Sequence, residues 1–185
     1  MHGIVFSAFR DFVSARHGSA VAKDLFAEQP EYAISEAYPD EALIELLGRA
    51  SEATGLDNDR LLNDFGAYTG EHVFPRLYPA FYSSARDTRS FLLTIEQRIH
   101  ELVRATIPDA APPRLQVAAL GVGGVEIAYD SPRRLCPLLE GLTIGTARFF
   151  GENAAMQETA CMLRGDQQCR FEVRLGERDE ASGIV

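Results

Sequence analysis

His100 is the first residue whose type and position suggest chemistry. It lies at the edge of the apolar arc of an amphipathic stretch from Ser90 to Ala110, where a surface histidine is not expected. A neutral imidazole on such a wall is either a core side chain bonded to a backbone carbonyl or a metal ligand that points into a cavity. Glu96 lies in the same angular sector and fits neither interpretation well.

Tyr129, Ser131 and Arg133 alternate along the chain where a predicted strand passes into a predicted helix. In extended backbone, alternate residues share one face, so three donors including a guanidinium would point the same way. Such a set suits a carboxylate, and two neighbouring carboxylates better still. The alternative is a polar strand end with one solvated arginine.

Three cysteines form a second group. Cys161 and Cys169 are expected to face each other across the last predicted hairpin, and Cys136 begins the preceding helix. Taken alone, such a group is as well explained by three buried free thiols as by a functional site.

A predicted helix must position His100, and predicted strands must position most of the other residues named above. Apolar residues recur at helical spacing in the first part of the chain, and they alternate in much of the second part. Predicted helices cover 3–17, 20–27, 40–54, 58–65, 90–107 and 135–150, and predicted strands cover 115–119, 125–129, 159–163 and 169–173. Residues 66–72 are expected to be a connection. This pattern predicts an α+β fold, in which an N-terminal helical subdomain precedes a roughly four-stranded antiparallel sheet with intervening helices.

Composition limits the class of protein. The 185 residues are 46% hydrophobic and 24% charged, as in one soluble domain, and the net charge of −9 argues against nucleic-acid or acidic-membrane partners. No apolar run could span a bilayer, and the N-terminus lacks the basic region of a secretory signal. An odd number of cysteines disfavours a disulfide framework, so we expect reduced thiols and a cytoplasmic location.

His100, the Tyr-x-Ser-x-Arg motif about thirty residues downstream and the intervening Pro112-Pro113 together resemble the haem nitric oxide/oxygen-binding (H-NOX) family, which includes stand-alone bacterial gas sensors. Further similarity lies in the Met-x-Gly-Ile start, Ala50 to Gly55, Phe74 to Leu77, Phe91-Leu92, Ile107 to Ala110 and Leu142 to Gly145. The resemblance implies one haem-binding H-NOX domain at 1–175, helical at 1–60 and haem-cradling at 61–175, with a flexible tail at 176–185. One departure is that the spacing from Phe91 to His100 is one residue longer than in some members.

The resemblance also implies roles for individual residues. His100 resembles the proximal ligand of the iron in haem b. The residues that resemble the grip on the haem propionates are Tyr129, Ser131 and Arg133. Pocket positions of the family are matched by Val5, Phe9, Phe74 and Leu138, and by Pro113, which resembles the proline that presses on the macrocycle.

Gas preference follows from the distal wall. Family members that hold dioxygen use a distal tyrosine as a donor, but Leu138 occupies that position here, and neither Val5 nor Phe9 offers a donor. The resemblance therefore implies binding of nitric oxide and carbon monoxide at ferrous haem and discrimination against dioxygen. Nitric oxide would release His100 from the iron and so switch the domain.

No segment resembles an enzyme, so the output is expected in a partner, either a histidine kinase or a cyclic-di-GMP-metabolising protein. Some bacterial members use three cysteines and a histidine to hold zinc, whereas Glu158 stands in place of the histidine here. The resemblance therefore implies a zinc site at Cys136, Cys161 and Cys169 that either Glu158 or a water molecule would complete. Two alternatives remain. One is a haem-free member that acts as a thiol or zinc redox sensor or as an interaction scaffold. The other is a thiol enzyme built on Cys136, which only two preceding arginines support.

Overall fold

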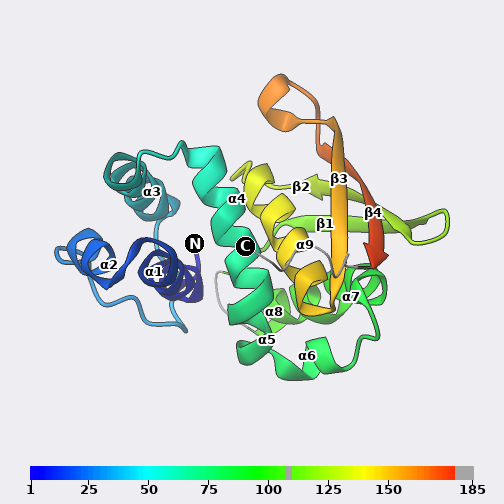
Figure 1. The fold of residues 1–185 in the computed structure, drawn as a ribbon, viewed down its shortest axis with the longest axis horizontal. Helices are drawn as coiled ribbons and strands as arrows, with labels where there is room; N and C mark the ends of the chain where they lie inside the picture. Colours follow the sequence, from blue (N-terminus) through cyan, green and yellow to red (C-terminus); the bar gives the residue numbers. More distant parts are fainter. Residues whose placement is uncertain (107–109, 178–185) are drawn as a thin grey trace.

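A computed structural model describes residues 1–106 and 110–177. It has the predicted α+β fold, with a helical half and a half built on an antiparallel sheet (Figure 1). The helical half contains α1 (Gly3–His17), α2 (Ser19–Leu25), α3 (Asp40–Thr54) and α4 (Asn58–Tyr68). Local chemistry explains these limits: the Asp57 carboxylate caps α4 by accepting from the backbone N–H of Arg60, and Gly55 ends α3 in the left-handed conformation.

The predicted connection at 66–72 is wrong, because the helix continues there. After α4 a π-helical turn, η1 (Thr69–Val73), leads into α5 (Phe74–Leu77) and α6 (Pro79–Ser83). Gly66 lies where α4 packs closely against α9, not in a turn. A Cβ atom on Gly66 would lie 2.5 Å from the carbonyl oxygen of Leu138, so only glycine allows α9 to approach this closely.

The predicted long helix around His100 has a π-helical turn in its middle. It consists of α7 (Thr88–Ile95), the π turn η2 (Glu96–His100) and α8 (Glu101–Thr106), and its predicted end at Ile107 lies outside the described residues. A π turn holds one more residue than an α turn, which rotates the following side chains by about 100°. Leu102, which would lie on the apolar face if the α-helix ran unbroken from Ser90, is consequently 48% exposed.

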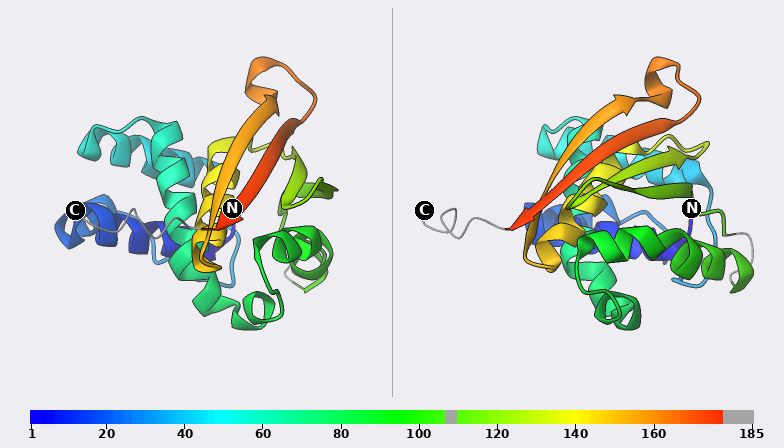
Figure 2. Two further views of the ribbon diagram at one scale, coloured as in Figure 1. Left: turned by 45° about the vertical axis from the view of Figure 1, so that its right-hand side comes forward. Right: turned by 90° about the vertical axis from the view of Figure 1, so that its right-hand side faces the viewer.

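Four strands form one antiparallel sheet in the order β1-β2-β4-β3 (Figures 1 and 2). Their bounds are β1 (Arg114–Leu120), β2 (Gly124–Asp130), β3 (Glu152–Ala160) and β4 (Cys169–Glu177). The helix α9 (Cys136–Phe149) joins the two hairpins and packs between α4 and the strand β3. The last strand extends two residues into the expected tail, and residues 178–185 lie outside the described part.

The predicted first arm of the final hairpin is misplaced. The strand lies at 152–160, and Leu163 lies in a 3-10 turn at Met162–Arg164. The backbone of Cys169 consequently pairs with Tyr129 of β2, and Cys161 follows the end of β3 instead of pairing with Cys169. Alternation alone could not locate this arm, because small and polar residues fill β3 and its inward face is only partly buried.

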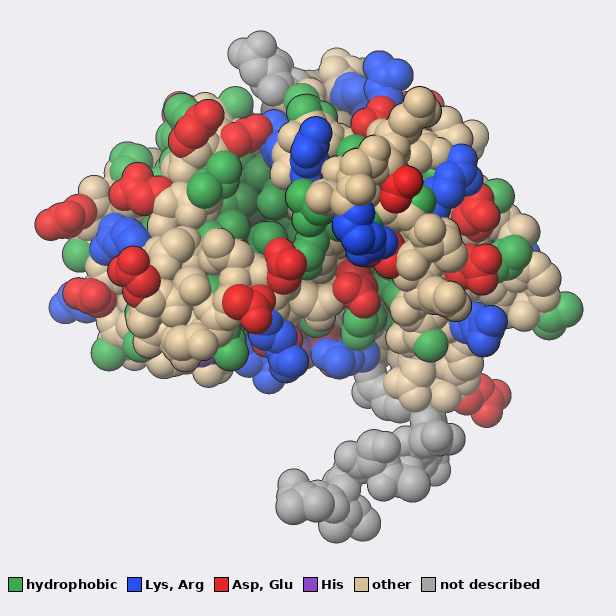
Figure 3. Space-filling view, turned by 90° about the horizontal axis from the view of Figure 1, so that it is seen from above, with side chains coloured by type: hydrophobic (Ala, Val, Ile, Leu, Met, Phe, Trp, Pro, Cys, Tyr) green, Lys and Arg blue, Asp and Glu red, His purple; other side chains and the backbone are tan. Residues whose placement is uncertain are grey.

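Two hydrophobic cores result. One lies among α1 to α4, and the other lies between the sheet, α7 and α9. On the face shown in Figure 3, acidic and basic side chains are interspersed without a broad basic patch. No helix in the described part of the chain is long and apolar enough to cross a membrane.

Candidate functional site

A cavity of about 280 Å³ lies between the two cores. A single buried water needs only about 10–15 Å³ on the same measure, so this space suits a cofactor-sized molecule. Of the residues expected to line a pocket, Val5, Phe74, Pro113 and Leu138 do so. Phe9 does not: it is fully buried in the helical core, with its ring centroid 5.1 Å from that of Phe65.

His100 lines this cavity from the C-terminal end of the π turn. Its Nδ1 lies 2.9 Å from Oε2 of Glu96, and because a carboxylate only accepts, Nδ1 carries the proton and donates it. Burial lowers the pKa of His100, and this outweighs the opposing effect of Glu96, so the ring is neutral at pH 7. No residue in the described part hydrogen-bonds Nε2, which leaves that nitrogen available to a ligand.

Glu96, to which the sequence assigned no role, contacts His100 directly. Its Oε2 also accepts from the backbone N–H of Leu115 at 3.0 Å, and its Oε1 accepts from Arg104. Burial alone would raise the pKa of Glu96, but the hydrogen bonds from Leu115, His100 and Arg104 hold it below its ordinary value. The only sequence signal was that Glu96 and His100 are four residues apart and therefore share a helix face.

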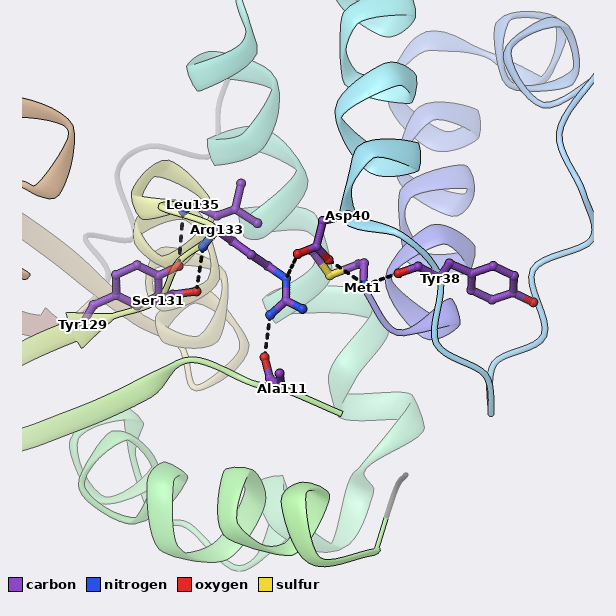
Figure 4. A network of polar contacts seen from close by, with 8 residues as sticks. All are labelled: Met1, Tyr38, Asp40, Ala111, Tyr129, Ser131, Arg133 and Leu135. Atoms are coloured by element: carbon purple, nitrogen blue, oxygen red, sulfur yellow. Dashed lines mark hydrogen bonds and ion pairs between the residues drawn. The ribbon is translucent and has the colours of Figure 1, made fainter. Parts of the chain in front are cut away.

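Tyr129, Ser131 and Arg133 come together at the rim of the same cavity (Figure 4). The Tyr129 hydroxyl accepts from the backbone N–H of Leu135 at 3.2 Å, and Ser131 Oγ accepts from the backbone N–H of Arg133 at 3.3 Å. Tyr129 and Ser131 are buried. The predicted grouping of three donors on one face is therefore realised in space.

The Arg133 guanidinium connects the two halves of the molecule. It donates to the carbonyl oxygen of Ala111, and its Nε lies 2.8 Å from Oδ2 of Asp40 at the start of α3. Asp40 also accepts from the amino group of Met1 at 2.6 Å. The buried Nε–H is not aligned for a hydrogen bond with any acceptor in the described residues, so its contact with Asp40 is an ion pair rather than an aligned hydrogen bond.

Further polar side chains line the cavity, among them Tyr82, Tyr78 and His2. The Tyr82 hydroxyl donates to the carbonyl oxygen of Gly70 at 3.4 Å, and burial raises its pKa to about 12. Tyr78 packs edge-on against Phe74, and burial raises its pKa as well. His2, which the sequence analysis passed over, lines the cavity with a buried Nε2 that has no hydrogen-bond partner in the described residues.

The cysteines form a compact cluster in the sheet half. One ligand atom each from Cys136, Glu158, Cys161 and Cys169 lies within 4.8 Å of the others, and the three thiols are buried. The sulfur atoms of Cys136 and Cys169 are 2.7 Å apart. Burial and the neighbouring thiol raise the pKa of the Cys136 thiol, and burial also raises that of Cys161.

Comparison with known proteins identifies the family. A family model described as Haem-NO-binding matches residues 2–158. The chain belongs to this family. No curated protein matches it by sequence.

Solved H-NOX structures share the fold of this family member. An H-NOX protein from S. oneidensis in the Fe(II)NO ligation state has a TM-score of 0.87 at 23% identity, with 96% of this chain and 100% of that chain covered. The Fe(II) unliganded H-NOX protein from K. algicida has a TM-score of 0.81 at 24% identity, with 96% and 98% covered. An H-NOX domain from Shewanella oneidensis in the Fe(II)CO state has a TM-score of 0.85 at 24% identity, with 96% and 100% covered.

Proposed function

We propose that this chain is a haem-based gas sensor that binds nitric oxide and carbon monoxide at ferrous haem b and discriminates against dioxygen. The observation that carries the proposal is that an unbonded imidazole nitrogen of His100 and the donors Tyr129, Ser131 and Arg133 line one large apolar cavity. When bound, the haem supplies an iron atom that takes diatomic gases. Membership of the family supports this choice of cofactor.

The residues of the cavity fit a haem. His100 offers Nε2 as the axial ligand, and its ring orientation is fixed by the bond from Nδ1 to Glu96. At the rim, the Arg133 guanidinium carries the positive charge that a propionate carboxylate needs, and a propionate would share or replace its ion pair with Asp40. We assign propionate binding to Tyr129, Ser131 and Arg133, and we assign contact with the macrocycle to Pro113.

The cavity positions that the family resemblance assigns to the distal side favour discrimination against dioxygen. Val5, Phe74 and Leu138 line the cavity without a hydrogen-bond donor, and bound dioxygen depends on such a donor more than nitric oxide or carbon monoxide does. The Tyr82 hydroxyl already donates to Gly70. Tyr78 also lines the cavity, so an experiment must test whether its hydroxyl donates to bound dioxygen.

Signalling would start at His100. If its bond to the iron were broken, the turn η2, which ends at His100, would no longer be held to the cavity, and the helical half could shift against the sheet. Because no catalytic motif is present in the sequence, the output passes to a partner in the cytoplasm, either a histidine kinase or a cyclic-di-GMP-metabolising protein. We propose that residues 1–175 act together as this one sensing domain.

Absorption spectra of the purified protein test this function. We expect a ferrous haem protein whose spectrum does not change to an oxy form in air and which becomes a five-coordinate nitrosyl with nitric oxide. His100→Gly should abolish the native ferrous spectrum, and imidazole should restore it. A stable oxy spectrum would contradict the gas preference, and its loss in Tyr78→Phe would assign Tyr78 as the donor.

A protein that stays colourless after reconstitution with hemin would contradict the haem proposal. The same result would favour the second candidate function, a haem-free redox sensor or interaction scaffold built on the cysteine cluster. The specific observation in favour of that candidate is the compact set of three thiols and one carboxylate.

We also propose that Cys136, Cys161, Cys169 and Glu158 bind zinc at a second site, separate from the haem cavity. Because zinc–sulfur bonds are about 2.3 Å long, the ligands of a tetrahedral site lie roughly 3.5–4 Å apart, and the cluster needs little adjustment to reach this spacing. Glu158 is held near the thiols while it pairs with Arg164 at 2.7 Å. That ion pair would be weakened or shared when the carboxylate binds the metal.

A further inference from the structure

We propose that Glu96 is the residue that sets the strength of His100 as an axial ligand. The inference rests on the proposed haem function and adds a positioning residue to it. Glu96 is not among the residues that line the cavity, and its carboxylate contacts His100, so its effect on a group in the cavity would pass through the histidine.

The hydrogen bond between His100 and Glu96 has a defined direction. The carboxylate can only accept, so Nδ1 of His100 is the protonated nitrogen and Nε2 is the nitrogen with a free lone pair. An acceptor with a full negative charge draws the Nδ1 proton toward itself and makes Nε2 a stronger electron donor. A neutral acceptor, such as a backbone carbonyl, has a weaker effect.

The Glu96 carboxylate is held in place by several hydrogen bonds. Three donors from different segments converge on it: the His100 ring, the Arg104 guanidinium and the backbone N–H of Leu115 on β1. Arg104 also donates to the carbonyl oxygen of Pro113 at 3.4 Å. Glu96 therefore ties the helix of His100 to the strand that begins beside the cavity, and the His100 ring cannot rotate without breaking this set of bonds.

The π turn η2 contains both Glu96 and His100. Glu96 and His100 are the first and last residues of η2, and the turn places both side chains between the helix and β1. The one-residue insertion thus coincides with the contact between ligand and carboxylate. π turns are rare and are often found at functional sites, because they re-aim side chains at a small cost in helix stability.

The hydrogen bond from His100 to Glu96 should therefore change the properties of the haem-bound protein. A stronger axial donor raises the iron–histidine stretching frequency and stabilises ferric over ferrous iron. It also resists release of His100 when nitric oxide binds. We expect Glu96 to hold the midpoint potential low and to slow conversion to the five-coordinate nitrosyl.

The test compares wild type with Glu96→Gln, which keeps an acceptor but removes the charge. Resonance Raman spectra of the ferrous unliganded protein should show the iron–histidine stretch at lower frequency, and the midpoint potential should rise. Haem affinity should fall about 10-fold to 100-fold, as is typical for loss of a carboxylate behind a metal-bound histidine. Glu96→Asp, which keeps the charge at a greater distance, should lie between the two.

Glu101→Gln is the matched control, because Glu101 adjoins His100, is exposed and loses the same charge. It should behave as wild type in all three measurements. An unchanged stretching frequency and potential in Glu96→Gln would overturn the inference, as would equal changes in Glu101→Gln, which would indicate a general charge effect.

A separate measurement keeps this inference distinct from the haem proposal. The ¹⁵N NMR signals of the His100 ring in the full haem-free chain should show an Nδ1-protonated tautomer that becomes mixed in Glu96→Gln. If the protein takes no haem, the proposed function fails while this tautomer still tests the role of Glu96. An Nε2-protonated ring in wild type would overturn the role of Glu96 directly.

Discussion

Single residues decide how the cysteine cluster behaves. The three thiols are buried, and burial favours their neutral, protonated form. They therefore stay protonated unless a metal ion binds and displaces the protons. Zinc at the proposed site would therefore compete with protons for the same sulfur atoms.

The zinc proposal predicts a loss of metal on substitution of one ligand. Protein made without added zinc should contain about one zinc per chain, whereas Cys161→Ala should contain far less, because a two-thiol site binds zinc much more weakly. Elemental analysis of both proteins provides the measurement. Ser14→Ala, an exposed position on α1, is the control. Equal zinc in wild type and Cys161→Ala would rule out the site.

Residue patterns predicted part of the site and missed the rest for identifiable reasons. The sequence placed His100 on an apolar edge and three donors on one face, since both follow from local periodicity. It could not assign Glu96, because one of its partners is the backbone of Leu115, nineteen residues away. His2 was missed because a residue ahead of a helix carries no periodic signal.

At the scale of elements, the contact between α4 and α9 leaves no room for a side chain at its glycines. A Cβ atom on Gly145 would lie 2.1 Å from the carbonyl oxygen of Ala67, which is backbone and cannot rotate away. The same two helices supply Phe65 and Leu138 to the cavity. Their spacing therefore sets both the stability of the fold and the width of the pocket.

Substitution of this glycine should separate the helices. We expect Gly145→Ala to lower the free energy of unfolding by about 1–3 kcal/mol, the usual cost of overpacking. Gly48→Ala is a matched control, because Gly48 lies within α3 with open space around its Cβ position, and it should raise stability by about 0.5–1 kcal/mol. Urea titrations of the three proteins measure both effects. Equal stability of Gly145→Ala and wild type would show that the helices can move apart freely.

Elements with strong local signals were predicted close to their true limits. Helices α1 and α3 end at glycines, and the Asp57 cap marks the start of α4. The two π turns were not predicted, since a single inserted residue barely alters hydrophobic spacing over a short helix. Gly66 and Gly70 were mistaken for a connection because glycine serves turns and close helix packing equally well.

At the scale of the whole molecule, the cavity lies between two cores that few polar contacts join. Asp40 is central to these contacts, because its carboxylate binds both the amino group of Met1 and the guanidinium of Arg133. Burial alone would raise the pKa of Asp40, but these two partners hold it below its ordinary value of 3.8. A carboxylate of this kind stabilises the folded state above its unfolded pKa, and the effect is lost as pH falls through the folded value.

Asp40→Asn should therefore lower the unfolding temperature at neutral pH, and the difference from wild type should shrink as pH falls from about 5 to about 2. Thermal unfolding followed by circular dichroism measures this difference. Asp64→Asn is the control, because the pair between Asp64 and Arg60 is exposed and contributes little. A difference that is the same at every pH would mean that the charge of Asp40 does not stabilise the junction.

The overall α+β arrangement followed from the change in periodicity along the chain, and the solved structures share it. The order of the strands did not follow, because pairing of β2 with β4 depends on contacts across α9 and on a third arm that was misplaced. Long-range pairing of this kind leaves no mark within a short window of sequence.

The π turn at Glu96–His100 also has a consequence for comparing relatives. If a homologue has an α-helix throughout this stretch, its chain is one residue shorter between the positions of Phe91 and His100. An alignment without a gap there matches either the start of the helix or the histidine, but never both. Only an alignment that places the gap inside the turn can reveal which relatives carry a carboxylate equivalent to Glu96.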